Sequence, residues 1–160
     1  MYPTYRVEEG KAKVFLFGRL ESGESFLTIN TFRPYFYIRT SDKEKTQNLV
    51  KGDYEDTGVT DFNGNQLTKV TLNIPAEVGE QRDVLVSSGI PCLEADIRFA
   101  YRFLMDKDIK GSLSIEGNFK KGHFVDRIYE EPELKPASFF PKLKTVSIDI
   151  ETNKEGSRIF

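Results

Sequence analysis

The first forty residues constrain the fold most, because they form a series of short, strand-like segments separated by tight turns. Aromatic and β-branched residues dominate four of these segments, YRVEE, KVFLFGRL, SFLTINTF and YFYIRT. Glu9-Gly10 and Ser22-Gly23 separate the first three, and glycine-containing pairs of this kind favour hairpins. The spacing therefore predicts an antiparallel, β-rich opening to the fold.

After residue 40 the pattern changes to alternating helices and strands. Ser41 and Glu44 form a capping-box pattern, which predicts a short polar helix ending near Gly52. Three further elements are expected: a strand at 67–74, a helix at 75–87 that begins with a proline, and a strand at 91–96. The sequence thus predicts the α+β class, with a ferredoxin-like portion in the order strand-helix-strand-helix-strand.

The last third predicts one more helix, a hairpin and a connector. The apolar stripe of a helix at 96–108 falls at Ile97, Ala100, Tyr101 and Leu104. Residues 112–119 and 123–130 are expected to pair as a hairpin. Prolines at 132, 136 and 141 disfavour helix and inner strand. The predicted organisation is an N-terminal domain at 1–131, a proline-rich linker at 132–144 and the start of a second domain at 145–160.

Composition excludes several kinds of protein. Lys and Arg number 23 and Asp and Glu number 25, so the chain lacks the basic excess of an autonomous nucleic-acid-binding domain. A single cysteine, Cys92, excludes an internal disulfide and a cysteine-built zinc site, and the only histidine, His123, is expected at the surface. Arg98, Arg102 and Lys107 are expected to form surface ion pairs. No segment is apolar enough to span a membrane, which predicts a soluble, cytoplasmic protein with no membrane partner.

Asp149 and Glu151 form the most suggestive pair of side chains. They alternate with Val146, Ile148 and Ile150, so on a strand the acids share one face. Their spacing of roughly 6.5 Å lets two carboxylates contact a pair of metal ions about 4 Å apart. Hard oxygen ligands favour Mg²⁺ or Mn²⁺. The alternative is an ordinary strand with acids on its solvated face.

Three segments together resemble family B DNA polymerases. LKTVSIDIET, residues 143–152, is similar to the first exonuclease motif of that family. FRPYFYI, residues 32–38, resembles its N-terminal R-P-Y signature, and LEADIRFAYRFLMDKDI, residues 93–109, resembles the helix that follows. The segments occur in the family's order across nearly the whole chain, and the bacterial DNA polymerase II branch is the most similar.

The resemblance implies that Asp149 and Glu151 are metal ligands for 3′–5′ proofreading, with two Mg²⁺ or Mn²⁺ ions in the full-length enzyme. Residues 145–160 would then be the first hairpin of an incomplete RNase H-like exonuclease domain. The later exonuclease motifs and the polymerase aspartates have no counterpart here, so residues 1–160 are expected to be an inactive, architectural fragment. The implied partners are DNA, both primer-template and template single strand, the rest of the polymerase chain and a sliding clamp. The implied location is the bacterial cytosol and nucleoid.

Archaeal members of the family sense uracil in the template with a pocket in this region, and the matching candidates are Pro34, Tyr35 and Ile90. Generic stacking of template bases on aromatic side chains is an alternative, and so is ordinary core packing of Tyr35. Two functions outside the polymerase remain open at this stage. One is a stand-alone single-stranded nucleic-acid-binding module, and the other is a nuclease completed by a second chain.

Overall fold

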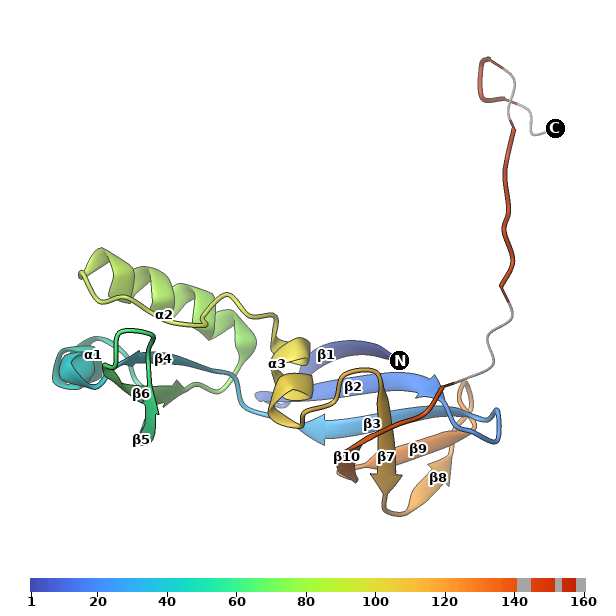
Figure 1. The fold of residues 1–160 in the computed structure, drawn as a ribbon, viewed down its shortest axis with the longest axis horizontal. Helices are drawn as coiled ribbons and strands as arrows, with labels where there is room; N and C mark the ends of the chain where they lie inside the picture. Colours follow the sequence, from blue (N-terminus) through green and yellow to red (C-terminus); the bar gives the residue numbers. More distant parts are fainter. Residues whose placement is uncertain (141–144, 152–153, 158–160) are drawn as a thin grey trace.

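The computed structural model describes residues 1–140, 145–151 and 154–157, which adopt a mixed α+β fold. Three sheets, three α-helices and one 3-10 turn are present in this part of the chain. In chain order the elements are β1 (Tyr2–Glu8), β2 (Lys11–Arg19), β3 (Ser25–Thr31), β4 (Tyr35–Arg39), η1 (Thr40–Asp42), α1 (Lys43–Leu49), β5 (Asp53–Thr60), β6 (Gln66–Thr71), α2 (Pro75–Ser87), α3 (Phe99–Asp106), β7 (Ser112–Glu116), β8 (Phe119–Lys121), β9 (Arg127–Glu130) and β10 (Glu133–Ala137). Figure 1 shows two halves, each built on a sheet, with α3 between them.

A five-stranded sheet in the order β1-β2-β3-β9-β8 forms one half. Its first three strands are antiparallel neighbours, as predicted, whereas β9 joins β3 in parallel. In the β1–β2 turn Glu9 has φ 51° and Gly10 has φ 73°. Two positive φ angles in a two-residue turn match the twist of the flanking strands, which explains the glycine at residue 10.

The first hydrophobic core lies between this sheet and α3. Val14 and Leu16 of β2 are fully buried and pack with Phe99 and Phe103. One residue of the predicted apolar face was wrong. Ala100 and Leu104 are buried as expected, but Tyr101 is 51% exposed. Two phenylalanine rings bury more apolar area than the predicted residues would, and a tyrosine hydroxyl is readily left in water.

A three-stranded sheet in the order β4-β6-β5 forms the other half. Phe36 and Ile38 of β4 and Val70 of β6 pack against Leu85 of α2 in a second core. Helix α2 occupies Pro75–Ser87, which confirms the prediction for that helix. The chain therefore has two hydrophobic cores, one in each half.

Three predictions in this half were wrong. The strand β5 was missed, because its sequence, with three acidic residues and a glycine, has low strand propensity while its backbone bonds to β6 decide its conformation. The strand expected at 91–96 is reduced to a single bridge between Tyr37 and Leu93. The capping box at Ser41 does not form, since a 3-10 turn precedes α1 and the N-cap residue Asp42 makes no side-chain capping bond. The observed order is β-α-β-β-α followed by one bridge.

The hairpin predicted for 112–119 and 123–130 is divided between two sheets. Strand β8 pairs with β9, while β7 pairs with β10, which lies inside the predicted linker 132–144. Pro136 lies opposite Leu113 in this two-stranded sheet. Each strand of such a sheet has a free edge, so a proline that donates no amide is tolerated there. Residues 141–144 of the linker lie outside the described residues.

Residues 145–151 form an extended segment without strand pairing to the rest of the described chain. Val146, Ile148 and Ile150 are 76%, 78% and 61% exposed, and Figure 1 shows the segment away from all three sheets. The strand expected for an exonuclease hairpin is thus not formed here, because no neighbouring strand supplies its backbone hydrogen bonds. Residues 152–153 and 158–160 of the predicted hairpin lie outside the described residues. None of the described helices has the length and apolar character needed to cross a membrane.

Candidate nucleic-acid interface

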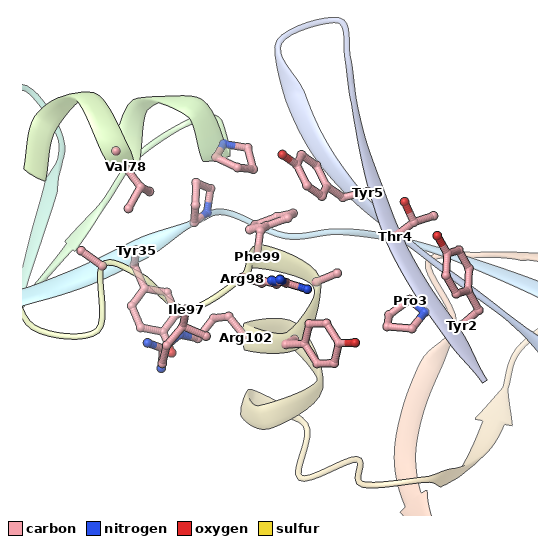
Figure 2. A pocket seen from close by; sticks show the side chains of 16 residues that line it. Tyr2, Pro3, Thr4, Tyr5, Tyr35, Val78, Ile97, Arg98, Phe99 and Arg102 are labelled. Atoms are coloured by element: carbon pink, nitrogen blue, oxygen red, sulfur yellow. The ribbon is translucent and has the colours of Figure 1, made fainter.

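A groove of about 460 Å³ lies where β1, the start of β4, α2 and α3 meet. Figure 2 shows side chains of β1, including Tyr2 and Tyr5, on one side and those of α3 on the other, with α2 above. Pro34 and Tyr35 enter the groove from the start of β4. Its volume falls in the range of small-ligand sites, about 300 to 1,000 Å³.

Contacts between aromatic rings, edge-to-face or tilted, fix the inner wall of the groove. The rings of Tyr5 and Phe99 are 5.2 Å apart at an interplanar angle of 75°. Phe32 lies 5.4 Å from Phe99 and 6.3 Å from Tyr35, and so joins the two halves of the molecule. Such pairs contribute about 1 kcal/mol each beyond their buried area, which holds the rings in place. Tyr2, by contrast, is 67% exposed at the rim.

Arg102 lies at the centre of a polar cluster behind the groove. It is only 6% exposed, and its Nη2 lies 2.7 Å from the carboxylate of Glu94. Its guanidinium lies 4.7 Å from the ring centre of Tyr35, which also has the Lys69 ammonium at 4.2 Å. Burial by itself would lower the pKa of Arg102, but the bond to Glu94 and the nearby acidic groups raise it overall. The arginine is therefore held charged and fixed.

The same cluster orients Tyr35. Its hydroxyl donates a hydrogen bond of 2.6 Å to Asp106 of α3. Burial, and then the bond to Asp106, raise the pKa of Tyr35 well above its ordinary value. The phenol is consequently neutral across the physiological pH range and presents a fixed ring to the groove.

The charge of the groove lining is positive. Arg98 and Arg102 are its only charged residues, and it contains no aspartate, glutamate, histidine or cysteine among the residues that the structure describes. Arg98 is exposed, with no ion-pair partner in the described chain. Because Arg102 is buried and paired with Glu94, Arg98 is the cation that a ligand would meet, and aromatic faces beside an exposed cation suit an anionic, planar ligand.

The structure brings together part of the predicted base-contacting set. Pro34 and Tyr35 line the groove, while Ile90 is 3% exposed and belongs to the core beneath α2. The surface ion pair predicted for Arg102 was wrong, because this residue is buried. Arg98 and Lys107 are exposed but form no ion pair within the described residues. Sequence reasoning also missed Tyr2, since nothing local connects β1 with α3.

Asp149 and Glu151 lie in the extended segment 145–151 and are both exposed. Two carboxylates suit Mg²⁺ or Mn²⁺ chemically. No group of three or more histidine, cysteine, aspartate or glutamate side chains able to hold a metal ion occurs within 1–140, 145–151 and 154–157. The metal-binding role of Asp149 and Glu151 stays a prediction.

Two other candidates are explained by their surroundings. Burial raises the pKa of the Cys92 thiol to about 11, so little thiolate exists at neutral pH and the residue is a poor nucleophile. Its side chain packs against the second core. His123 is exposed in the β8–β9 turn, as predicted.

Comparison with known proteins gives a consistent group of relatives. The chain is 30% identical over 159 residues to a DNA polymerase of Archaeoglobus fulgidus, an alignment that covers 92% of this chain. It is 37% identical over 73 residues, 45% of its length, to DNA polymerase II of Escherichia coli K12. The fold matches a family B DNA polymerase from Pyrobaculum calidifontis with a TM-score of 0.70, at 23% identity and over 89% of this chain. No protein-family model matches the chain.

These relatives are much longer than the present chain. The alignments cover 20% of the Archaeoglobus polymerase, 9% of the Escherichia polymerase and 21% of the Pyrobaculum polymerase. The aligned regions therefore make up about a fifth or less of each relative, and the rest of each relative lies outside the comparison.

Proposed function

This chain is homologous to the N-terminal region of family B DNA polymerases, and on that premise we propose that its groove contacts the template single strand. The whole protein to which it corresponds would be a DNA-directed DNA polymerase with a 3′–5′ proofreading exonuclease. In that enzyme the present region would be architectural and would border the path of the template.

The composition of the groove carries this proposal. Tyr2 and Tyr101 offer exposed ring faces at its rim, and Arg98 offers a free guanidinium beside them. Each base stacked on an aromatic ring contributes about 1 to 3 kcal/mol without any need for a particular sequence. In a duplex the base faces are already stacked on each other, so this arrangement favours an unpaired strand. The position of Ile90 in the core supports generic stacking over specific sensing of uracil.

Fluorescence anisotropy with labelled single-stranded oligonucleotides tests the groove. We expect Tyr2→Ala combined with Tyr101→Ala to weaken binding at least about fivefold, the equivalent of about 1 kcal/mol. Phe62→Ala removes a ring that is more exposed than either tyrosine and lies outside the groove lining, and it serves as the control. Equal affinity of the groove variant and the unchanged chain would contradict the proposal. A clear preference for uracil-containing strands would replace generic stacking with base sensing.

We also propose a role in the 3′–5′ exonuclease activity of the whole enzyme: Asp149 and Glu151 would belong to its active site and hold Mg²⁺ or Mn²⁺. The metal would supply charge stabilisation for phosphodiester hydrolysis, and the two carboxylates would contribute oxygen ligands from one side. We expect residues 1–160 alone to degrade no single-stranded DNA. Metal-dependent degradation abolished by Asp149→Ala would contradict this expectation. Contacts with a sliding clamp and a location in the bacterial cytosol and nucleoid remain predictions.

The alternative function is a stand-alone single-stranded nucleic-acid-binding module. One observation favours it, because the cationic groove is complete within the described residues. The net charge of −2 counts against tight binding without other domains. Affinity of residues 1–160 for single strands at physiological salt distinguishes the two functions, since a module that acts alone needs at least micromolar binding there.

A further inference from the structure

We propose that the β8–β9 hairpin is a second contact site for single-stranded nucleic acid, formed by Phe119, Lys121 and Phe124. None of these residues lines the groove. Strands β1 and β8 are the two opposite edges of the five-stranded sheet, so two strands, β2 and β3, separate the β8–β9 hairpin from the β1 wall of the groove. The inference therefore does not depend on the groove being a binding site.

The register of the hairpin places an aromatic ring and a free cation on the same face. Phe119 pairs with Tyr129 and Lys121 pairs with Arg127, and alternate residues of a strand share a face. Phe119 is 46% exposed, and the Arg127 guanidinium lies 4.4 Å from its ring centre. The ammonium of Lys121 has no hydrogen-bond or ion-pair partner within the described chain and is exposed.

Lys120, which directly precedes Lys121, differs from it in the face that it occupies and in its ion pairing. It pairs with Ile128 and so projects from the other face of the hairpin. Its ammonium lies 3.0 Å from the carboxylate of Glu130, which neutralises it. Of these two neighbouring lysines, only Lys121 has a charge left to pair with a phosphate.

The turn holds Phe124 out in solvent by a fixed backbone. The Asp126 carboxylate accepts 2.7 Å hydrogen bonds from both the amide and the hydroxyl of Ser25. A Cβ at Gly122 would come within 2.4 Å of the carbonyl oxygen of Val125, so the turn closes tightly only with glycine there. Phe124 remains 93% exposed, with the His123 ring edge-on at 4.7 Å. A ring presented this way is free to stack on a base without prior rearrangement.

Phe62 shows why the charge around an exposed ring matters. It is also fully exposed, in a turn closed by the Asp61 carboxylate, which accepts 2.9 Å bonds from the amides of Asn63 and Asn65. Each turn carries an aspartate, Asp61 beside Phe62 and Asp126 near Phe124. The difference is the free cation: Lys121 is unpaired within the described residues and attracts a phosphate, whereas Arg39, the cation at the Phe62 turn, is paired with Asp61. Of the two exposed phenylalanines in hairpin turns, only Phe124 is therefore paired with the chemistry of a nucleic-acid contact.

The test is fluorescence anisotropy of the 160-residue chain with a labelled oligothymidylate of about 20 nucleotides, long enough for more than one contact. We expect Phe124→Ala to weaken binding at least about fivefold, while Phe62→Ala leaves it unchanged. We expect Lys121→Gln to reduce the slope of log affinity against log salt by about 0.7, the value for one phosphate contact with a single strand. Lys120→Gln, the matched lysine control, should leave that slope unchanged. Circular dichroism confirms that each variant is folded.

The outcomes separate the hairpin from the groove. Loss of affinity in the tyrosine variant of the groove, with none in the Phe124 and Lys121 variants, supports the groove and overturns the hairpin site. The reverse supports the hairpin and contradicts the groove. If the unchanged chain binds no oligothymidylate, the hairpin is not a nucleic-acid contact and the proposal fails. It also fails if Phe124→Ala changes the oligomeric state measured by sedimentation but leaves the affinity for oligothymidylate unchanged.

Discussion

The groove and the segment 145–151 differ in how their functional side chains are held. Arg102 is 6% exposed and fixed by Glu94 and Tyr35, which come from separate parts of the chain. Asp149 and Glu151 are exposed in an extended segment that packs against no other described element. Yet the acids belong to a motif that stands out in the sequence, whereas Arg102 looks like a surface residue there. A pair of residues that forms a recognisable motif is thus not necessarily held in place by the fold, and a residue that the fold holds in place is not necessarily part of a motif.

The difference also determines what each region is able to do within the described residues. The inner wall of the groove is preformed, because Phe99, Tyr5 and Phe32 hold one another through ring contacts, so a ligand there would meet side chains that are already ordered. A pair of carboxylates on an unpaired segment lacks the further ligands and the neighbouring strands that fix a metal site. Substitutions of held side chains at the groove are therefore expected to lower stability much more than substitutions in the segment 145–151.

The largest expected effect is that of Arg102→Ala. Removing the buried guanidinium leaves Glu94 without its partner and Tyr35 without one of its two cations, and we expect the free energy of unfolding to fall by about 2 to 3 kcal/mol. This value lies below that of a fully buried pair because Glu94 is half exposed. Urea unfolding followed by circular dichroism measures it. Arg98→Ala, at the exposed start of α3, is the control and should change stability by less than about 0.5 kcal/mol. Equal losses of stability in the two variants would show that the buried Arg102 matters no more for folding than the exposed Arg98.

A smaller and pH-dependent effect is expected for Tyr35→Phe. The hydrogen bond to Asp106 is lost, at a cost of about 1 to 2 kcal/mol at neutral pH. Because folding raises the pKa of Tyr35, its protonated phenol stabilises the chain fully below about pH 10, and this contribution is lost as the pH rises towards the raised value. The stability of the unchanged chain should thus fall towards that of the variant above pH 10. Urea unfolding at pH 7 to 11 measures both, and a constant difference across that range would show that Tyr35 does not titrate with unfolding.

The smallest effect is expected in the segment 145–151. Asp149→Asn combined with Glu151→Gln alters exposed side chains without described partners, so the free energy of unfolding should change by less than about 0.5 kcal/mol. Millimolar Mg²⁺ should leave the melting temperature of both chains unchanged, because two exposed carboxylates bind the ion weakly. Differential scanning calorimetry measures both quantities. A rise in melting temperature with Mg²⁺ that the double variant lacks would mean that the acids form a real site in this chain.

Much of the fold could be predicted wherever local chemistry decides it. The Glu9-Gly10 turn requires positive φ angles, and Pro75 with Gly89 marks the limits of α2, so these features follow from short stretches of sequence. Strand β5 could not be predicted, because its acidic sequence becomes a strand only through backbone bonds to β6. Strand β10 was missed because a proline excludes an inner strand, while only the sheet order shows that β10 lies at an edge.

The candidate site shows the same limit more sharply. Pro34 and Tyr35 were found through a motif, but Arg102 was assigned to the surface because a charged residue on a short helix is usually solvated. Its burial results from Glu94 and the ring of Tyr35, which the fold brings to it. Tyr2 and Tyr101 are almost a hundred residues apart, and only the contact between β1 and α3 places them on one rim.

Short stretches of sequence were enough to predict the turns, the strand-rich opening, helix α2 and the motifs that resemble family B DNA polymerases. Turn geometry, proline and glycine conformation and the spacing of side chains act over a few residues, so they are present in the linear order. The pairing of edge strands, the burial of Arg102 and the set of aromatic rings that share a groove became clear from the folded chain alone. Those outcomes depend on contacts between distant segments, where burial and hydrogen-bond partners outweigh local propensity.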